Sequence, residues 1–334
     1  MPRKRVFITR PYHPEAQEYL AQRYDVDVWE EHLGPTKAEF LKRVPGIHAL
    51  FTEGLDAIDS DIYDAAADLE VIGNRAVGTD NLDIPGATAR GIYVTNTPSI
   101  LQDACADMAF ALILGAARRV AFGDRSIRAG KWRFFDQTPY LGTNVYGKTL
   151  GIVGLGGIGQ RVARRASGFD MRVLYHSRTR KPDLEESMGV EWAGDLGRLL
   201  SESDFVSLHM PLMAETTGLI GKPELERMKP EAFLVNTSRG KTVDPKALYD
   251  ALKAGVIAGA ALDVTEPEPI PMDDPLLTLP NVVFTPHVAS SSSETFKAMA
   301  RMAVDNIVGA IEDQQLVHPV ALAGDCLARQ EIAN

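Results

Sequence analysis

Three residues that could carry chemistry each lie just past an apolar segment of the sequence: Arg239, Glu268 and His287. An arginine can grip a carboxylate through two parallel hydrogen bonds. A histidine can exchange a proton near neutral pH. A carboxylate on its second ring nitrogen would fix the tautomer and stabilise the imidazolium. Together these groups would suit the reduction of a 2-keto acid by hydride, with a proton delivered to the carbonyl oxygen.

Each of the three residues also has an ordinary structural alternative. Arg239 could pair with Asp244 on the surface, and His287 could be a capping or core histidine. Glu266 competes with Glu268, because both lie in the same proline-rich turn. The three residues stand out because a dinucleotide-binding motif occurs in the same sequence.

That motif is G-x-G-x-x-G at Gly154, Gly156 and Gly159, with an apolar run before it and a helical pattern after it. In a βαβ unit the first glycine permits the tight turn, the second lets the backbone approach a pyrophosphate, and the third lets helix and strand pack closely. The helix N-terminus supplies free N–H groups and partial positive charge. The alternative is a glycine-rich turn without a ligand. The residues expected to hold the dinucleotide here are Gly154, Leu155, Gly156, Gly157, Ile158 and Gly159.

The residues after the second strand of this unit predict the choice of cofactor. An acidic side chain there would accept hydrogen bonds from the ribose 2′-OH of NAD and repel a 2′-phosphate. The sequence has no carboxylate until Asp183, and residues 177–180 are polar or basic. We therefore expect NADPH to be preferred, with NAD possible; the alternative is that the arginines belong to a solvated turn. The residues expected at the phosphate are Ser177, Arg178, Thr179 and Arg180.

Strand-like and helix-like segments alternate along almost the whole chain, which predicts parallel α/β architecture. The strands expected before the motif are 6–9, 25–29, 48–52, 70–76 and 92–95, and from the motif on they are 149–154, 171–176, 204–210, 232–237, 257–263 and 281–285. Helices 102–121 and 293–312 would be the crossovers, Pro245 and Gly255 would bound a helix, and 123–148 reads as an excursion loop. The fold class is a Rossmann-type dinucleotide-binding domain inserted into a smaller flavodoxin-like α/β substrate domain.

Composition limits the possible partners. The formal charge of the 334-residue chain is −10, which argues against nucleic acid or an anionic membrane as the main partner. The most apolar helical stretch, 108–117, is too short to span a bilayer. The basic start at residues 2–5 lacks the apolar region of a secretory signal, and Cys105 and Cys326 form no metal-type cluster. We expect a cytoplasmic protein without a metal.

Taken together, the ordered motifs resemble the D-isomer-specific 2-hydroxyacid dehydrogenase family, and within it most of all the glyoxylate/hydroxypyruvate reductases. The matching segments are 76–83, 93–98, 151–159, 236–240, 262–269 and 285–290. The resemblance implies a homodimer with a discontinuous substrate domain, 1–98 plus 288–334, around a dinucleotide domain, 99–287. It also implies the roles of individual residues: Arg239, Glu268 and His287 as the catalytic set, backbone N–H groups of Val77 and Gly78 for the substrate carboxylate, Asp263 for the nicotinamide amide, and Thr237, Ser238 and Ala289 near the cofactor.

Departures from the family pattern leave the exact substrate open. Glu53 and Gly54 stand where an apolar residue is common, and Arg75 stands where a smaller or aromatic one is common. Glu53 and Arg75 would either pair with each other or read a polar substrate tail. Competing functions are a dehydrogenase for another 2-hydroxy acid such as 3-phosphoglycerate, phosphite oxidation, and a nucleotide-sensing co-repressor. For the dimer, the apolar candidates are Trp132, Phe134 and Phe135; the alternative is that they cover the subunit's own core.

Overall fold

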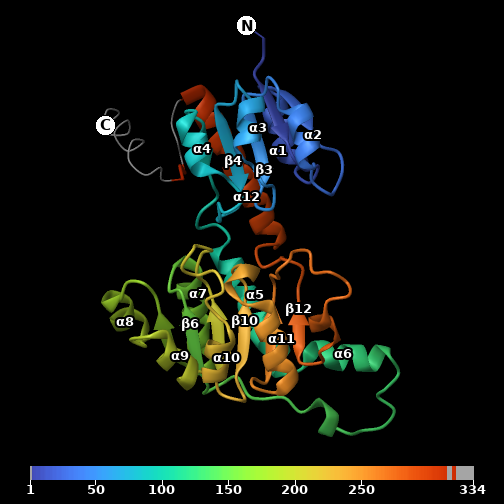
Figure 1. Ribbon diagram of the computed structural model, residues 1–334, viewed down its shortest axis with the longest axis vertical. Helices are drawn as coiled ribbons and strands as arrows, with labels where there is room; N and C mark the ends of the chain where they lie inside the picture. Colours follow the sequence, from blue (N-terminus) through green and yellow to red (C-terminus); the bar gives the residue numbers. More distant parts are fainter. Residues whose placement is uncertain (1, 314–317, 321–334) are drawn as a thin grey trace. The chain divides into compact units, whose positions relative to one another are not determined.

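The computed structural model describes residues 2–313 and 318–320 (Figure 1). It divides into two compact units, Met1–Leu101 with Ser292–Asn334, and Gln102–Ser291. The sequence placed these divisions slightly earlier, after residues 98 and 287. Cys326 lies outside the described residues. No helix in the described part of the chain is long and apolar enough to cross a bilayer.

The first unit is built on a five-stranded parallel sheet in the order β2-β1-β3-β4-β5. This is the flavodoxin-like order, so the predicted fold of this unit is confirmed. The strands are β1 Arg5–Ile8, β2 Asp25–Val28, β3 Ala49–Glu53, β4 Val71–Arg75 and β5 Tyr93–Thr95. Its helices are α1 Pro14–Ala21, α2 Lys37–Arg43, α3 Ser60–Ala65, α4 Ile84–Ala89 and α12 Ser293–Val308.

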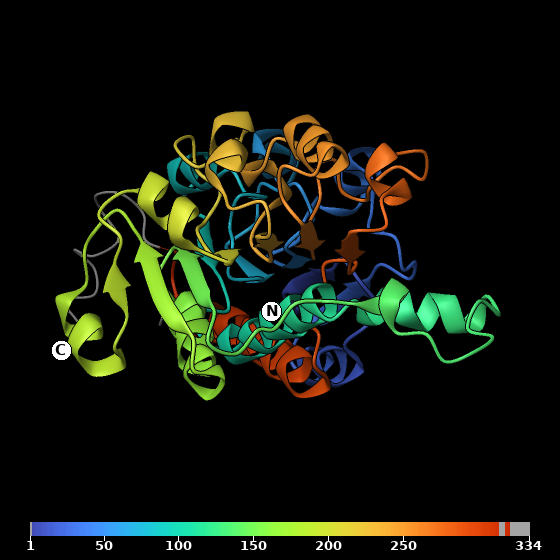
Figure 2. The ribbon, with the colours of Figure 1, turned by 90° about the horizontal axis from the view of Figure 1, so that it is seen from below.

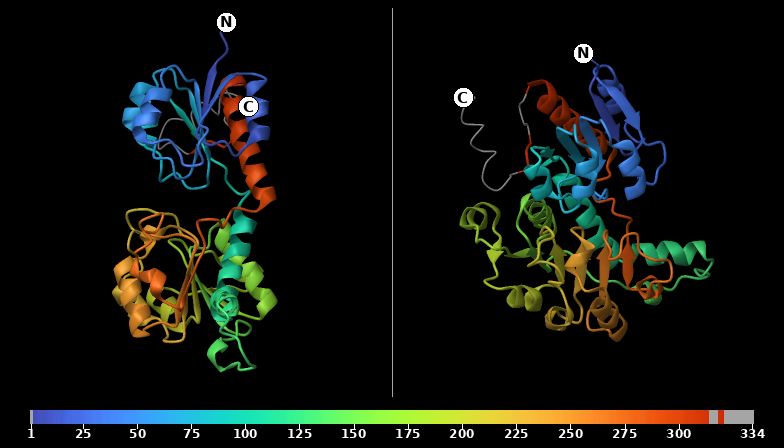
Figure 3. Two further views of the ribbon diagram at one scale, coloured as in Figure 1. Left: turned by 90° about the vertical axis from the view of Figure 1, so that its right-hand side faces the viewer. Right: turned by 45° about the horizontal axis from the view of Figure 1, so that its top comes forward.

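Helices cover both faces of this sheet, which explains why its inner strands β1, β3 and β4 are buried along almost their whole length, whereas the edge strand β2 is partly exposed. On one face, the strand residues Phe7, Leu50 and Ile72 pack with side chains of α2, α3 and α4. On the other, Val6 and Phe51 pack with side chains of α1 and α12. Figure 3 shows α12, in red, alongside the sheet on the side opposite α2 and α3. Successive side chains of each strand point to opposite faces of the sheet, so they contribute to two separate apolar layers.

The second unit has a seven-stranded parallel sheet in the order β12-β11-β10-β9-β6-β7-β8. The order reverses at β6, as in the Rossmann fold, so that predicted fold is confirmed as well. The strands are β6 Thr149–Val153, β7 Arg172–His176, β8 Glu191–Trp192, β9 Phe205–Leu208, β10 Phe233–Asn236, β11 Gly259–Leu262 and β12 Val282–Phe284. The sequence missed β8, because a strand of two residues carries no alternating pattern.

Two helical layers cover this sheet (Figure 2). Side chains of α9, α10 and α11 form one apolar core, and those of α5 and α7 form the other. The helices are α5 Gln102–Ala117, α6 Val120–Arg128, α7 Gly157–Ala166, α8 Pro182–Met188, α9 Leu196–Glu202, α10 Lys222–Arg227 and α11 Pro245–Ala254. The predicted bounds of α11 are confirmed: Asp244 caps it, Pro245 opens it, and Gly255 ends it in the left-handed conformation.

The predicted helix 102–121 ends four residues early, at Ala117, and the predicted loop 123–148 is helical at its start, up to Arg128. The chain leaves α5 at Ala117, turns at Arg119, whose φ of 54° is left-handed, and continues as α6 into the predicted loop. The cause is a capping contact from a distant segment: the Thr143 N–H donates to the Ala117 carbonyl oxygen at 2.9 Å. A Cβ on Gly142 would lie 2.2 Å from the same oxygen, so only glycine lets the chain return this closely.

Candidate active site

The glycine loop between β6 and α7 has the geometry that a bound dinucleotide requires. Gly154 has a φ of 98°, and a Cβ there would lie 2.8 Å from the backbone of His209. A Cβ on Gly159 would lie 2.2 Å from the Gly154 carbonyl oxygen, so this glycine allows helix and strand to pack. Around Gly156 the space is open. Two glycines thus serve packing, and the middle one leaves room for a phosphate to approach the backbone.

Helix α7 starts directly at this loop with Gly156 as its N-cap, and no side chain caps it. The N–H groups of its first turn, at Gly157, Ile158 and Gly159, therefore remain available for an anion. The preceding N–H, that of Leu155, donates instead to the Ser177 hydroxyl at 2.8 Å. Ser177 thus couples the glycine loop to the end of β7.

The two arginines in the turn after β7 differ in their contacts. Arg180 donates to both oxygens of Glu185, at 2.9 and 2.7 Å. Arg178 is exposed, like Thr179, and makes no hydrogen bond or ion pair with the part of the chain that the structure describes. The sequence grouped both arginines at the phosphate. Arg180 thus has a carboxylate partner within the protein, and the expectation that both arginines meet the phosphate stays a prediction.

His287 lies in the turn that follows β12, and its Nδ1 contacts the Glu268 carboxylate. Its backbone is left-handed, with a φ of 54°, which is uncommon for a residue with a side chain. Glu268 comes from the loop after β11, where the Glu266–Pro267 and Glu268–Pro269 peptide bonds are both cis. The imidazole is about one-third exposed, so its Nε2 edge remains open to a ligand.

The left-handed turn at His287 is held by Asp263, a buried residue at the end of β11. One oxygen of this carboxylate accepts from the Thr285 hydroxyl at 2.5 Å and the Val288 N–H at 2.9 Å. The other accepts from the Ala289 N–H at 2.8 Å, and the His287 N–H donates to the Asp263 carbonyl oxygen at 2.8 Å. Asp263 thus clamps the segment that carries the histidine on both sides of it.

Arg239 depends on a similar buried residue, Asn236, at the end of β10. The Asn236 amide nitrogen donates to the Arg239 carbonyl oxygen at 2.9 Å, and its amide oxygen accepts from the Ser238 N–H at 3.0 Å and from its hydroxyl at 2.8 Å. A Cβ on Gly240 would lie 1.9 Å from the Thr265 carbonyl oxygen, so the loop packs tightly against the one that leads to Glu268. Thr237 and Ser238 are both buried in this loop.

His209, at the end of β9, is a site residue that sequence reasoning missed. Its Nε2 lies 2.7 Å from the Ser207 hydroxyl, and its backbone is the closest neighbour of Gly154. Burial lowers the pKa of His209 to about 4, so the ring is neutral at physiological pH. The signal in the sequence was a lone histidine after a strand, which by itself indicates no role.

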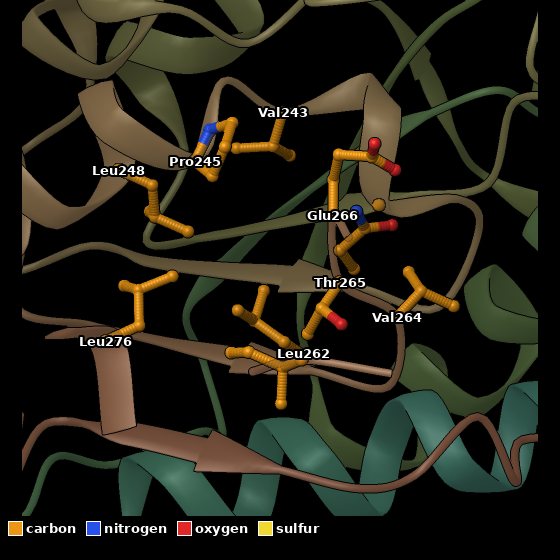
Figure 4. A pocket seen from close by; sticks show the side chains of 11 residues that line it. Val243, Pro245, Leu248, Leu262, Val264, Thr265, Glu266 and Leu276 are labelled. Atoms are coloured by element: carbon orange, nitrogen blue, oxygen red, sulfur yellow. The ribbon is translucent and has the colours of Figure 1, made fainter. Parts of the chain in front are cut away.

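Glu266, the glutamate that competed with Glu268 in the sequence, lines a small cavity (Figure 4). Its volume is about 20 Å³, room for a single water molecule. Glu266 lines it, whereas Glu268 contacts His287. The other lining residues are mostly apolar and come from α11 and the ends of β10 and β11: Asn236, Gly240, Val243, Pro245, Leu248, Leu262, Val264, Thr265, Ile270 and Leu276.

In the first unit, the loop after β4 presents unpaired backbone N–H groups. Its carbonyl oxygens are all tied down: that of Ala76 accepts from the Thr97 N–H, that of Val77 from the Asn96 amide, and that of Gly78 from the buried Asn74 amide. The N–H groups of Val77 and Gly78 have no acceptor among the described residues. Successive free N–H groups on a fixed loop form an anion-binding concavity.

Glu53 and Arg75, the two departures from the family pattern, pair with each other. The Arg75 Nε lies 2.8 Å from both oxygens of Glu53, and the guanidinium lies over the Phe296 ring at 4.4 Å. His13 Nε2 is 3.0 Å from the same carboxylate. Burial by itself would raise the pKa of Glu53, but hydrogen bonds from His13 and Arg75 hold it below the ordinary value. Of the two alternatives, the pairing is the one that forms, and Gly54 packs next to it against Ala76.

The comparisons with known proteins agree with this geometry. Residues 110–289 match the family model described as D-isomer specific 2-hydroxyacid dehydrogenase, NAD binding domain. The chain belongs to this family. It is 52% identical to a glyoxylate reductase of Korarchaeum cryptofilum over 91% of this chain and 92% of that protein. It is 47% identical to the glyoxylate reductase of Pyrococcus furiosus over 91% of each. The resemblance stated from the motifs is therefore confirmed.

Solved structures give the same result. A protein of Thermus thermophilus, 44% identical, superposes with a TM-score of 0.90 over 95% of this chain and all of its own. An NADPH-dependent glyoxylate/hydroxypyruvate reductase of Sinorhizobium meliloti, determined with NADP and malonate, is 32% identical with a TM-score of 0.83, over 96% of this chain and 97% of that one. The present protein, as a member of this family, is an oxidoreductase that uses a nicotinamide dinucleotide. Within residues 2–313 and 318–320, no group of three or more His, Cys, Asp and Glu side chains could hold a metal ion.

Proposed function

We propose that this enzyme reduces glyoxylate and similar small 2-keto acids, such as hydroxypyruvate, to the D-2-hydroxy acid, with NADPH as the preferred cofactor. The observation that carries the chemistry is the contact of His287 Nδ1 with Glu268 at the end of a Rossmann sheet. The named relatives are glyoxylate reductases, which supports the substrate class.

The dinucleotide fits the residues present, because the backbone around Gly156 is open and the first turn of α7 is uncapped. When bound, the reduced nicotinamide supplies a hydride to the keto carbon. His287 carries a proton on Nε2 and passes it to the carbonyl oxygen as the negative charge develops there. Glu268 holds the other ring nitrogen in its N–H form and stabilises the imidazolium. Arg239 pairs with the substrate carboxylate or the developing oxyanion.

The substrate carboxylate is assigned to the free N–H groups of Val77 and Gly78, on the strength of the anchored loop that carries them. Glu53 and Arg75 form an ion pair with each other, so neither side chain offers an unpaired charge to a substrate tail. A small, uncharged side group such as that of glyoxylate or hydroxypyruvate agrees with this. Asp263 has three of its roughly four acceptor positions filled, so one remains for the nicotinamide amide.

The preference for NADPH is assigned to Arg178 with Ser177 and Thr179, because no acidic side chain follows β7 before Asp183. The structure determined with NADP belongs to a relative, and it supports the possibility of this cofactor. NAD would be accepted less well, since its 2′-OH has no carboxylate to donate to in this turn.

We also propose a homodimer formed through the segment between α6 and β6. In this segment Trp132, Phe134 and Phe135 are 56%, 75% and 81% exposed. Trp132 and Phe135 line an open groove together with Tyr140 and Leu141. Large exposed aromatic side chains on one segment usually mark an interface. A cytoplasmic location stays a prediction from the sequence.

The test is a spectrophotometric panel of 2-keto acids with NADPH and NADH, on wild type and His287→Ala. We expect glyoxylate or hydroxypyruvate with NADPH to give the highest kcat/KM. His287→Ala should lower kcat by at least ~100-fold, the size of a lost general acid. Arg239→Ala should cost a similar factor. Turnover near that of wild type in a folded His287→Ala protein would refute the assignment, and a preference for a bulky or dianionic keto acid would refute the substrate class.

A further inference from the structure

The turn between β7 and α8 is held by a buried tyrosine and a glutamate that no step of the reaction uses. Tyr175 is fully buried in β7. Its hydroxyl donates to Glu185 at 2.7 Å and accepts from the Lys181 N–H at 2.7 Å. The Glu185 carboxylate also binds Arg180 through two hydrogen bonds. Residues 177–181 are therefore tied to the sheet at their far end.

At its near end the same turn is tied to the glycine loop, through the bond from the Leu155 N–H to the Ser177 hydroxyl. Arg178 lies between these two anchors, exposed and without a partner among the described residues. A short segment fixed at both ends has few conformations left to lose when it binds a ligand. The geometry thus favours Arg178 over Arg180 as the cation that a ligand at this turn would meet.

The charges in this network do not change near physiological pH. Hydrogen bonds from Arg180 and from Tyr175 lower the pKa of Glu185 to about 2. Burial and the hydrogen bond to Glu185 raise the pKa of the Tyr175 hydroxyl. Glu185 is therefore ionised and Tyr175 is neutral near physiological pH, so Arg180 keeps a compensated charge.

We propose that Tyr175 and Glu185 are positioning residues for recognition of the cofactor 2′-phosphate. They fix the turn 177–181 and hold Arg180 as a tether, which leaves Arg178 as the phosphate ligand. This inference rests on the NADPH preference proposed above and deepens it. In the simplest interpretation of two neighbouring arginines, both bind the phosphate. In our proposal Arg180 anchors the turn instead and does not bind the phosphate.

The test is a double-mutant cycle on Arg180 and Glu185, read with two competitive inhibitors, adenosine 2′,5′-bisphosphate and 5′-AMP. These probes differ only in the 2′-phosphate. Arg180→Ala and Glu185→Gln should each weaken the binding of the bisphosphate by about three- to tenfold, which is the size of a coupling between residues of one network. The double variant should be no weaker than either single variant. In all three variants the affinity for 5′-AMP should change by less than about twofold, which is within the range of a surface substitution.

Three further variants sharpen this test. Arg178→Ala should remove most of the discrimination between the two inhibitors. Tyr175→Phe keeps the buried ring and loses only the hydroxyl, so it should behave like Glu185→Gln and should speed hydrogen exchange at the Lys181 amide. Lys246→Ala, which breaks an exposed ion pair with Asp250 in α11, is the matched control and should leave both inhibitors unchanged.

Two results would overturn the inference while the NADPH preference stands. One is tighter binding of the bisphosphate in Glu185→Gln, which would mean that a released Arg180 binds the phosphate. The other is additive losses in the double variant. Equal binding of the two inhibitors by the wild type is a different failure, because it refutes the NADPH preference and, with it, this inference.

Discussion

Replacing Asp263 by Asn tests whether His287, the proposed general acid, is held in place by the buried carboxylate. The two side chains have the same shape, but the amide has one acceptor oxygen and one NH2 donor. In the protein, three donors converge on the carboxylate: the Thr285 hydroxyl, the Val288 N–H and the Ala289 N–H. If the amide oxygen keeps the first two, its NH2 group faces the Ala289 N–H, and two donors meet.

The cost follows from the burial of the site, since Asp263 is 1% exposed and water cannot replace the lost acceptor. A buried donor left without a partner costs about 1–3 kcal/mol, and the two remaining bonds weaken because they lose a charged acceptor. We expect a local destabilisation of about 2–4 kcal/mol, which corresponds to roughly 30- to 700-fold faster opening of the turn. With the turn at His287 loosened, kcat should also fall.

Hydrogen exchange of the peptide that spans residues 282–290 measures this opening directly, without assuming that the whole chain unfolds in one step. Asp244→Asn is the matched control. It makes the same chemical change at the N-cap of α11. There, among the described residues, the Asp244 carboxylate accepts a hydrogen bond only from the Ala247 N–H, at 3.0 Å, and Asn caps equally well. Exchange at 282–290 that rises no more in Asp263→Asn than in Asp244→Asn would show that Asp263 does not hold the turn.

Three other changes have defined outcomes. Glu268→Gln should narrow the pH range of full turnover, because the imidazolium of His287 loses its charged partner; an unchanged pH–rate profile would contradict the pairing. Burial lowers the pKa of His209 in the folded state to about 4, so between pH 6.5 and about 4 the unfolded wild type binds a proton that the folded protein does not. The free energy of unfolding of the wild type therefore falls as the pH falls through this window. His209→Asn removes the titrating group and should make this free energy less sensitive to acid there. Phe135→Ser should shift the protein from dimer to monomer in light scattering, whereas Leu33→Ser, at an equally exposed leucine of the other unit, should not.

The fold could be predicted from the sequence because parallel strands buried on both faces read as short apolar runs between helical patterns. The glycine motif could also be read in detail, since each glycine answers a separate steric demand: the neighbouring His209 backbone, the open side, and the Gly154 carbonyl oxygen. The convergence of Arg239, Glu268 and His287 on loops after adjacent strands followed from a general property of parallel sheets.

What the sequence left out depends on contacts between distant segments. The end of α5 is set by Thr143, which lies 26 positions beyond the carbonyl oxygen that it caps, at Ala117. The tether that we propose for Arg180 depends on Glu185 and on the Tyr175 hydroxyl, which reaches Glu185 from the sheet. Neither contact has a local pattern, because in both cases a polar group finds its partner only after the chain has folded.

The side chains proposed to act in catalysis and the residues that hold them follow different physical rules. Arg239 and His287 have to stay partly exposed to meet a ligand, so packing cannot fix them. Their positions are fixed instead through their backbones, by Asn236 and Asp263, which are buried at the ends of β10 and β11 and take up the polar groups of the loops. A buried polar group with every partner in place is costly to disturb. Arg178, to which we assign the choice of cofactor, lies outside these clamps, so we expect that it can be replaced without moving His287 and Arg239.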